Sequence, residues 1–226
     1  MSAIPWLLAI DTATATIVVA AGSPDGAVIA EDAFEGRYRH SQELLPAIAR
    51  LTERTGLQLA GLTGIIAGTG PGAFTGLRVG LATAKTLAHE LARPIVGIST
   101  AEALLDASPG AGTLWLPSGA RDRVLVGRGQ DPRIVRGDEG LEPDQSAIAV
   151  DLDGRAPEGA IAGGREAVAR LGASLLRLGA TRLAAGAVDD PERLVPRYAS
   201  PPRGVPLEPP ASKPDDGGIA WSRDPR

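Results

Sequence analysis

The chain has 226 residues, of which 43% are hydrophobic and 22% charged, and its formal net charge is −4. These ordinary values exclude disorder throughout, and the scattered Lys and Arg residues predict no unaided binding to nucleic acid. The lack of cysteine excludes disulfides and thiolate sites, and the two histidines, His40 and His89, disfavour a multi-histidine metal site.

The first hundred residues predict strands and helices in the order βββαβαβα. Trp6–Asp11 is a continuous apolar run that is typical of a buried strand rather than of a signal peptide, and no apolar run approaches transmembrane length. We therefore expect no membrane association. Three antiparallel strands extended by two helix-linked parallel strands form a ribonuclease-H-like lobe. Strands are predicted at 6–11, 16–20, 28–34, 64–68 and 95–98, and helices at 41–54, 75–91 and 101–107, the last with Thr100 as its N-cap.

Beyond Pro109–Gly112, a turn-rich stretch that marks a lobe boundary, the periodic signal weakens. The predicted fold class is α/β, an actin-like ATPase (ribonuclease-H-like) fold with two lobes, the second smaller. We divide the chain into a first lobe (1–108), a second, smaller α/β lobe (109–199) and a Pro-rich tail (200–226) that is predicted to be disordered. Second-lobe strands are predicted at 113–116, 124–126, 147–150 and 159–162, and a helix at 165–178.

A glycine-rich turn, Gly70–Gly76, lies between a predicted strand and a helix, where a backbone can cradle a phosphate. A Walker A loop would need Gly-Lys-Ser/Thr, but Leu77 follows Gly76. On the glycine pattern alone, a tight turn that sets the helix close to the sheet is the favoured interpretation.

Asp11 ends the first strand, where sugar kinases and actin-type ATPases keep an acid for a metal-bound nucleotide. It either serves a nucleotide or braces its turn, and the sequence favours neither interpretation. Candidate residual nucleotide contacts are Asp11, Thr12, Gly70 and Gly72.

Gly76, Gly80, Ala84 and Ala88 recur every four residues on the second predicted helix and so share one face. A face without large side chains permits close approach of another helix, and glycine costs helix stability, roughly 1 kcal/mol relative to alanine. The face packs either inside its own lobe or against another subunit. The spacing by itself somewhat favours the first alternative.

His40 begins the first helix, and a metal site there would need a second histidine four residues later, where Leu44 stands. We therefore expect no metal and no cofactor. Nothing in the sequence resembles a nucleophile elbow, which leaves a peptidase as a weak alternative.

Several segments together resemble one family, the TsaB (YeaZ) family, in order and spacing. The resemblance is strong over residues 6–105 and most specific in the run that begins at Gly70. In the second lobe it is thin, with an echo at Val195–Tyr198. The matching segments are Leu8–Thr12, Arg39–Ser41, Leu44–Pro46, Gly70–Gly80, Ala84–Lys85 and Gly97–Leu104.

The resemblance implies a non-catalytic paralogue of TsaD, the subunit that transfers a threonylcarbamoyl group to the adenosine beside the anticodon of tRNAs reading A-starting codons. It implies a TsaD-like partner bound through the first-lobe helices, a TsaE-like ATPase in the same assembly, no catalytic residue and a cytoplasmic location. A homodimer can form when TsaD is absent. With the family in view we favour the subunit interface for the small-residue face. Expected interface residues are His40, Leu44, Leu45, Ile48, Gly76, Leu77, Gly80, Ala84 and Ala88.

Two features depart from the family. Leu44 replaces the second histidine of the TsaD metal pair, and Gly119-Ala120-Arg121 replaces an Asp-Ala-Arg run in the second lobe. A nucleotide clamped between lobes normally needs acids from both sides for its metal. The alternative function is an actin-like ATPase or small-molecule kinase that uses Asp11 and the Gly70–Gly76 loop.

Overall fold

A computed structural model describes residues 3–36, 40–137 and 146–198 of the chain. The predicted tail, 200–226, and the side chain of His40 lie outside the described residues. Among the described helices, none combines the length and apolar character needed to cross a membrane.

The first sheet has five strands in the order β3-β2-β1-β4-β5, with β1 antiparallel to β2 and parallel to β4. This arrangement confirms the predicted first lobe, because β2 and β3 pair as a hairpin and β4 and β5 add in parallel. Every residue of β1 is buried, as its uninterrupted apolar run predicts. The strands are β1 (Trp6–Asp11), β2 (Thr16–Gly22), β3 (Val28–Glu35), β4 (Leu62–Gly68) and β5 (Ile95–Ile98).

Helices α1 (His40–Thr55) and α2 (Phe74–Glu90) pack on one face of this sheet, and a short 3-10 turn (Leu59–Gly61) leads from α1 into β4. Leu44 and Leu51 of α1 and Leu81 of α2 share a buried cluster with side chains of β1. The apolar faces that the helical spacing predicts therefore face this sheet.

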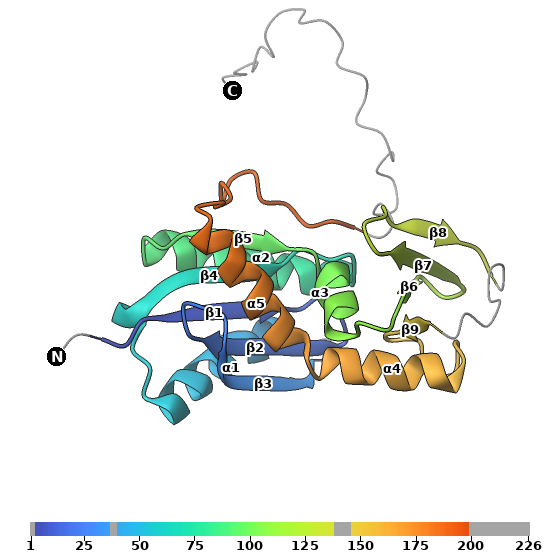
Figure 1. Ribbon diagram of the computed structural model, residues 1–226, viewed down its shortest axis with the longest axis horizontal. Helices are drawn as coiled ribbons and strands as arrows, with labels where there is room; N and C mark the ends of the chain where they lie inside the picture. The colour runs from blue at the N-terminus through green and yellow to red at the C-terminus, as the bar shows by residue number, and fades with distance from the viewer. Residues whose placement is uncertain (1–2, 37–39, 138–145, 199–226) are drawn as a thin grey trace, which may run out of the picture.

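The second sheet has four strands in the order β8-β7-β6-β9 (Figure 1). The three-residue strand β8 was not predicted, and the strand predicted at 159–162 is wrong because those residues lie inside α4. An apolar run of four residues cannot be told from a helix turn by periodicity. The elements are β6 (Thr113–Ser118), β7 (Asp122–Gly127), β8 (Arg133–Val135), β9 (Ala147–Ala149) and α4 (Glu158–Val168).

Helix α5 (Leu171–Ala184) covers the other face of the first sheet, in front of the strands in Figure 1. The single helix predicted at 165–178 is therefore wrong, since the chain bends at 169–170 between α4 and α5. A Cβ on Gly179 would lie 2.4 Å from Ile66 of β4, which shows how closely α5 approaches the sheet. Helix α5 lies in the predicted second lobe (109–199) but packs on the first sheet.

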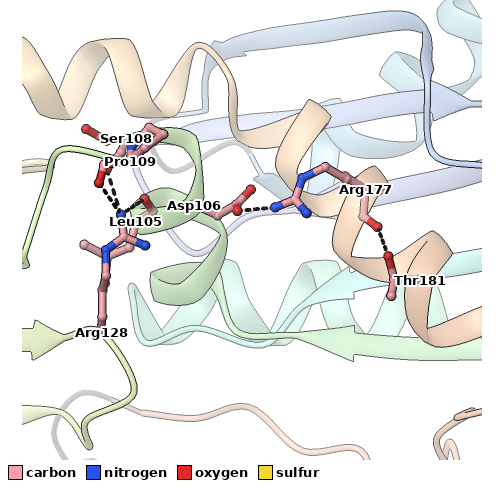
Figure 2. A network of polar contacts seen from close by, with 7 residues as sticks. All are labelled: Leu105, Asp106, Ser108, Pro109, Arg128, Arg177 and Thr181. Atoms are coloured by element: carbon pink, nitrogen blue, oxygen red, sulfur yellow. Dashed lines mark hydrogen bonds and ion pairs between the residues drawn. The ribbon is translucent and has the colours of Figure 1, made fainter.

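Helix α3 (Thr100–Ala107) lies between the two sheets, and charged side chains fix its C-terminal half (Figure 2). Arg128, just after β7, donates to the carbonyl oxygens of Leu105 at 2.7 Å and Ser108 at 2.9 Å, at the C-terminal end of the helix. Asp106 pairs with Arg177 of α5. The α3 segment thereby joins both lobes through one shared core.

Candidate functional site

Asp11, at the carboxyl end of β1, is buried and fully engaged in hydrogen bonds. Its Oδ2 accepts from the Thr100 hydroxyl at 2.6 Å and its Oδ1 accepts from the Ala13 N–H at 2.8 Å. Burial raises the pKa of Asp11 to about 6, opposed by these two hydrogen bonds and aided by the nearby Asp151. The acid therefore braces its own turn, which is one of the two interpretations that the sequence left open.

Thr100 was predicted as the N-cap of α3, but Ser99 is the cap, and its hydroxyl oxygen accepts from the Glu102 N–H. Thr100 is instead the first helical residue, which leaves its hydroxyl free to connect two loops. It donates to Asp11 and accepts from the Gly70 N–H at 2.9 Å. One threonine thus ties the end of β1 to the glycine-rich turn.

The glycine-rich turn folds directly onto the turn after β1. The Ala73 N–H donates to the Ala13 carbonyl oxygen at 2.7 Å, and a Cβ on Gly72 would lie 2.1 Å from that same oxygen. The four residues predicted as nucleotide contacts are therefore brought to one junction, but each is engaged by the chain itself: Asp11 and Gly70 by Thr100, Thr12 by Gly76, and Gly72 by the Ala13 backbone. Glycine is required at 72 by the closeness of the two backbones.

The small-residue face of α2 points into its own lobe. The Thr12 hydroxyl donates to the Gly76 carbonyl oxygen at 2.7 Å, and a Cβ on Gly80 would lie 2.1 Å from Thr12 Oγ1. Gly76, Leu77, Gly80, Ala84 and Ala88 are all buried. Packing within the chain therefore explains why this face has small residues, and the predicted interface cannot rest on it.

On α1 the predicted interface residues divide by exposure. Leu44 and Ile48 are buried in the core, whereas 54% of Leu45 is exposed. Arg50 lies over the Phe34 ring of β3, so the helix turns one flank toward β3. Leu45 and Ala49 project from the other flank by helical spacing, and both are exposed.

Asp151, directly after Val150 at the end of the second sheet, was missed by the sequence analysis. Its Oδ2 accepts from the Ala15 N–H at 2.7 Å, and its charge contributes to the raised pKa of Asp11. An acid after an apolar run was the available signal, but only folding brings it to Asp11. Among the described residues no cluster of three or more His, Cys, Asp or Glu side chains could hold a metal ion.

A family model described as TsaD, tRNA N6-adenosine threonylcarbamoyltransferase, matches residues 35–159. The TsaB protein of Escherichia coli is 39% identical over 121 residues, which cover 53% of this chain and 48% of that protein. The TsaB protein of Bacillus subtilis is 38% identical over 98 residues, which cover 43% and 42%. The chain spans about half the length of these curated relatives or less.

Among solved structures, YeaZ from Pseudomonas aeruginosa aligns with a TM-score of 0.62 at 21% identity, covering 86% of this chain and all of that one. This likeness shows the fold. Fold and site together define an α/β protein with an actin-like fold whose glycine-rich turn is closed by its own backbone. The family model spans more than half of the chain, which belongs to that TsaD-related family and, within it, to the TsaB (YeaZ) group.

Proposed function

We propose that this chain is a non-catalytic subunit in the synthesis of threonylcarbamoyladenosine in tRNA, and that it binds a TsaD-like catalytic subunit. The names of the E. coli and B. subtilis relatives place those proteins in this biosynthesis. A TsaE-like ATPase joins the same assembly. The part contributed by this chain is a surface rather than a reaction centre.

The closure of the Gly70–Gly76 turn on the turn after β1 carries the non-catalytic assignment. A phosphate needs free N–H and O–H donors, whereas the Thr12 hydroxyl and the Gly70 and Ala73 N–H groups already donate within the chain. Each of these bonds would have to break before a nucleotide could use the donor. Since a buried polar group left without its partner costs about 1–3 kcal/mol, tight nucleotide binding is disfavoured.

The outer face of α1 and α2 is the proposed partner surface, and we define it by Leu45 and Ala49 of α1 and Ala82 and Thr86 of α2. All four are exposed. On α2, Ala82 and Thr86 lie four residues apart, opposite the buried face. Small outward side chains permit a second helix to approach closely, and Leu45 supplies an apolar anchor. Close packing of a partner helix, which the sequence predicts for the small-residue face of α2, is therefore proposed for the exposed face of that helix instead.

The test is binding of the full chain to the TsaD-like protein of the same organism. Ala82→Glu places a large charged side chain at the middle of the outer face and should abolish co-elution. Ala184→Glu makes the same change at an exposed residue at the end of α5 and should have no effect. Leu45→Glu with the matched control Leu59→Glu repeats the comparison on α1, since both leucines are about half exposed. Normal co-elution of both outer-face variants would refute the proposal.

The isolated chain is expected to use the same face for a homodimer when the partner is absent, because an exposed apolar patch associates. Light scattering of the isolated chain and of Ala82→Glu tests this. The variant should be a monomer at concentrations where the wild type is dimeric.

A further inference from the structure

Residues 188–198, which we call the strap, follow α5 and run beside the edge strand β5 (Figure 1). The Asp189 N–H donates to the Ile95 carbonyl oxygen at 2.9 Å, and Asp189 Oδ2 accepts from the Gly97 N–H at 2.7 Å. Arg182 of α5 pairs with the same carboxylate at 3.0 Å. The strap is therefore fixed at its start and covers an edge that would otherwise be open to another strand.

The strap then reaches the flank of α2. Leu194 packs against the core of the first lobe, and its carbonyl oxygen accepts from Lys85 Nζ at 3.2 Å. The Arg197 N–H donates to the Thr69 carbonyl oxygen at 2.7 Å, beside the glycine-rich turn. These contacts direct the strap toward the first turn of α2.

The strap meets α2 in a cluster of two aromatic rings and one guanidinium. The Phe74 and Tyr198 rings lie 4.9 Å apart between centroids, and the Arg78 guanidinium carbon lies 3.9 Å above the Phe74 ring. Arg78 Nε donates to the Tyr198 hydroxyl at 3.0 Å. Neither Nη1 nor Nη2 of Arg78 has an acceptor among the described residues.

We propose that this cluster binds a carboxylate of the TsaD-like partner, an inference that rests on the proposed function. A guanidinium held by a ring and a hydroxyl loses little freedom on binding, and its planar donors match a carboxylate in a fork. Arginine and aromatic side chains of this kind dominate many interfaces. The positive charge of Arg78 favours an acidic group of the partner over an apolar one at this cluster.

The position of the cluster selects the partner. Arg78 and Ala82 are four residues apart on α2 and so lie next to each other on the helix surface. A subunit seated on the outer face at Ala82 therefore lies beside Arg78, whereas the ammonium group of the other neighbouring cation, Lys85, already donates to the Leu194 carbonyl oxygen. The strap contributes Tyr198 to this edge and so extends the partner surface beyond the two helices.

The experiment measures the dissociation constant of the full chain for the TsaD-like protein by calorimetry, at low and high salt. Arg78→Ala should weaken binding on the order of tenfold, the size of one charge-assisted hydrogen bond. Arg78→Lys, which keeps the charge but not the fork, should lie between wild type and Arg78→Ala. Tyr198→Phe keeps the ring stack and should weaken binding by about threefold. Arg121→Ala removes an exposed arginine of the second lobe and serves as the control.

Raised salt should weaken the wild type more than Arg78→Ala, because the variant has lost the charge pair. Unaltered binding by Arg78→Ala, together with loss of binding by Ala82→Glu, would overturn this inference and leave the proposed function intact. Unaltered binding by Arg78→Ala, Ala82→Glu and Leu45→Glu alike would overturn both. Melting temperatures of all variants show whether the chain stays folded. If Arg78→Ala unfolds the chain, Tyr198→Phe still tests the proposal.

Discussion

Thr12 and Gly80 lie so close that a Cβ on Gly80 would stand 2.1 Å from Thr12 Oγ1. The hydroxyl cannot simply turn away, because it donates to the Gly76 carbonyl oxygen one helical turn earlier. Helix α2 is thus held against the turn after β1, and its residues Gly76 and Gly80 lie at the contact.

Gly80→Ala should destabilise the isolated chain by about 1–3 kcal/mol, because the added methyl group overpacks the contact with Thr12. Urea unfolding followed by circular dichroism measures the change. Gly159→Ala in α4 is the matched control, since a Cβ there would meet nothing within 4 Å and alanine favours a helix. A Gly80→Ala variant as stable as the wild type would show that α2 is not held in this way.

Thr100→Val should destabilise the chain by about 1–3 kcal/mol, because it leaves the buried Gly70 N–H without its acceptor and Asp11 without a donor. Thr100→Ser keeps the hydroxyl and should retain most of the stability. The Thr100 hydrogen bond lowers the pKa of Asp11, so its loss should raise that pKa further. Urea unfolding of both variants, with NMR titration of the Asp11 carboxyl, checks the prediction. Equal losses of unfolding free energy in Thr100→Val and Thr100→Ser would contradict it.

The stability of the wild type should fall relative to Asp11→Asn as the pH rises from about 4 to about 6. The folded chain keeps the Asp11 proton up to a pKa of about 6, whereas the ordinary value is 3.8, so between these values the folded state binds more protons than the unfolded state. The full stabilising contribution is present below pH 3.8 and is lost above the folded pKa. The difference between these pKa values corresponds to about 3 kcal/mol. Parallel pH profiles of unfolding for the two proteins would contradict the prediction.

Arg128→Ala should lower the stability by about 1–3 kcal/mol, because the carbonyl oxygens at the end of α3 lose a charged donor (Figure 2). Arg121→Ala, an exposed arginine that precedes β7, should be neutral. Thermal melts of both variants decide the comparison. Hydrogen exchange should show the loss of protection concentrated in α3, and an unchanged α3 would refute the assignment.

Calorimetry of the isolated chain with Mg-ATP should show no heat of binding, because the donors at the glycine-rich turn are already used within the chain. Tight binding with turnover that is lost in Asp11→Asn would instead favour the actin-like ATPase or small-molecule kinase.

The first lobe could be predicted from sequence because each element carries its own signal. Trp6–Asp11 is a continuous apolar run, and glycine or proline punctuates the helices, so the bounds differ from the structure by two residues or fewer. The second lobe carries weak signals, since β8 has three residues and α4 begins with a glycine- and alanine-rich stretch. Strand and helix periods cannot be separated over so few residues.

The candidate site was predictable in its parts but not in its connections. Helical spacing shows that Gly76 and Gly80 share a face, but not that this face meets Thr12, 68 positions earlier than Gly80. Asp151 is joined to Ala15 across 136 positions, a contact that only the completed fold creates. Exposure, which separates Leu45 from Leu44, is likewise a tertiary property.

The most direct test concerns the exposed side of α2. The full chain and its Ala82→Glu variant are each mixed with the TsaD-like protein of the same organism, and complex formation is measured by size-exclusion chromatography with light scattering. Our account predicts a stable complex for the wild type and separate proteins for a variant that melts at the wild-type temperature. A complex of undiminished affinity with the folded variant would contradict it.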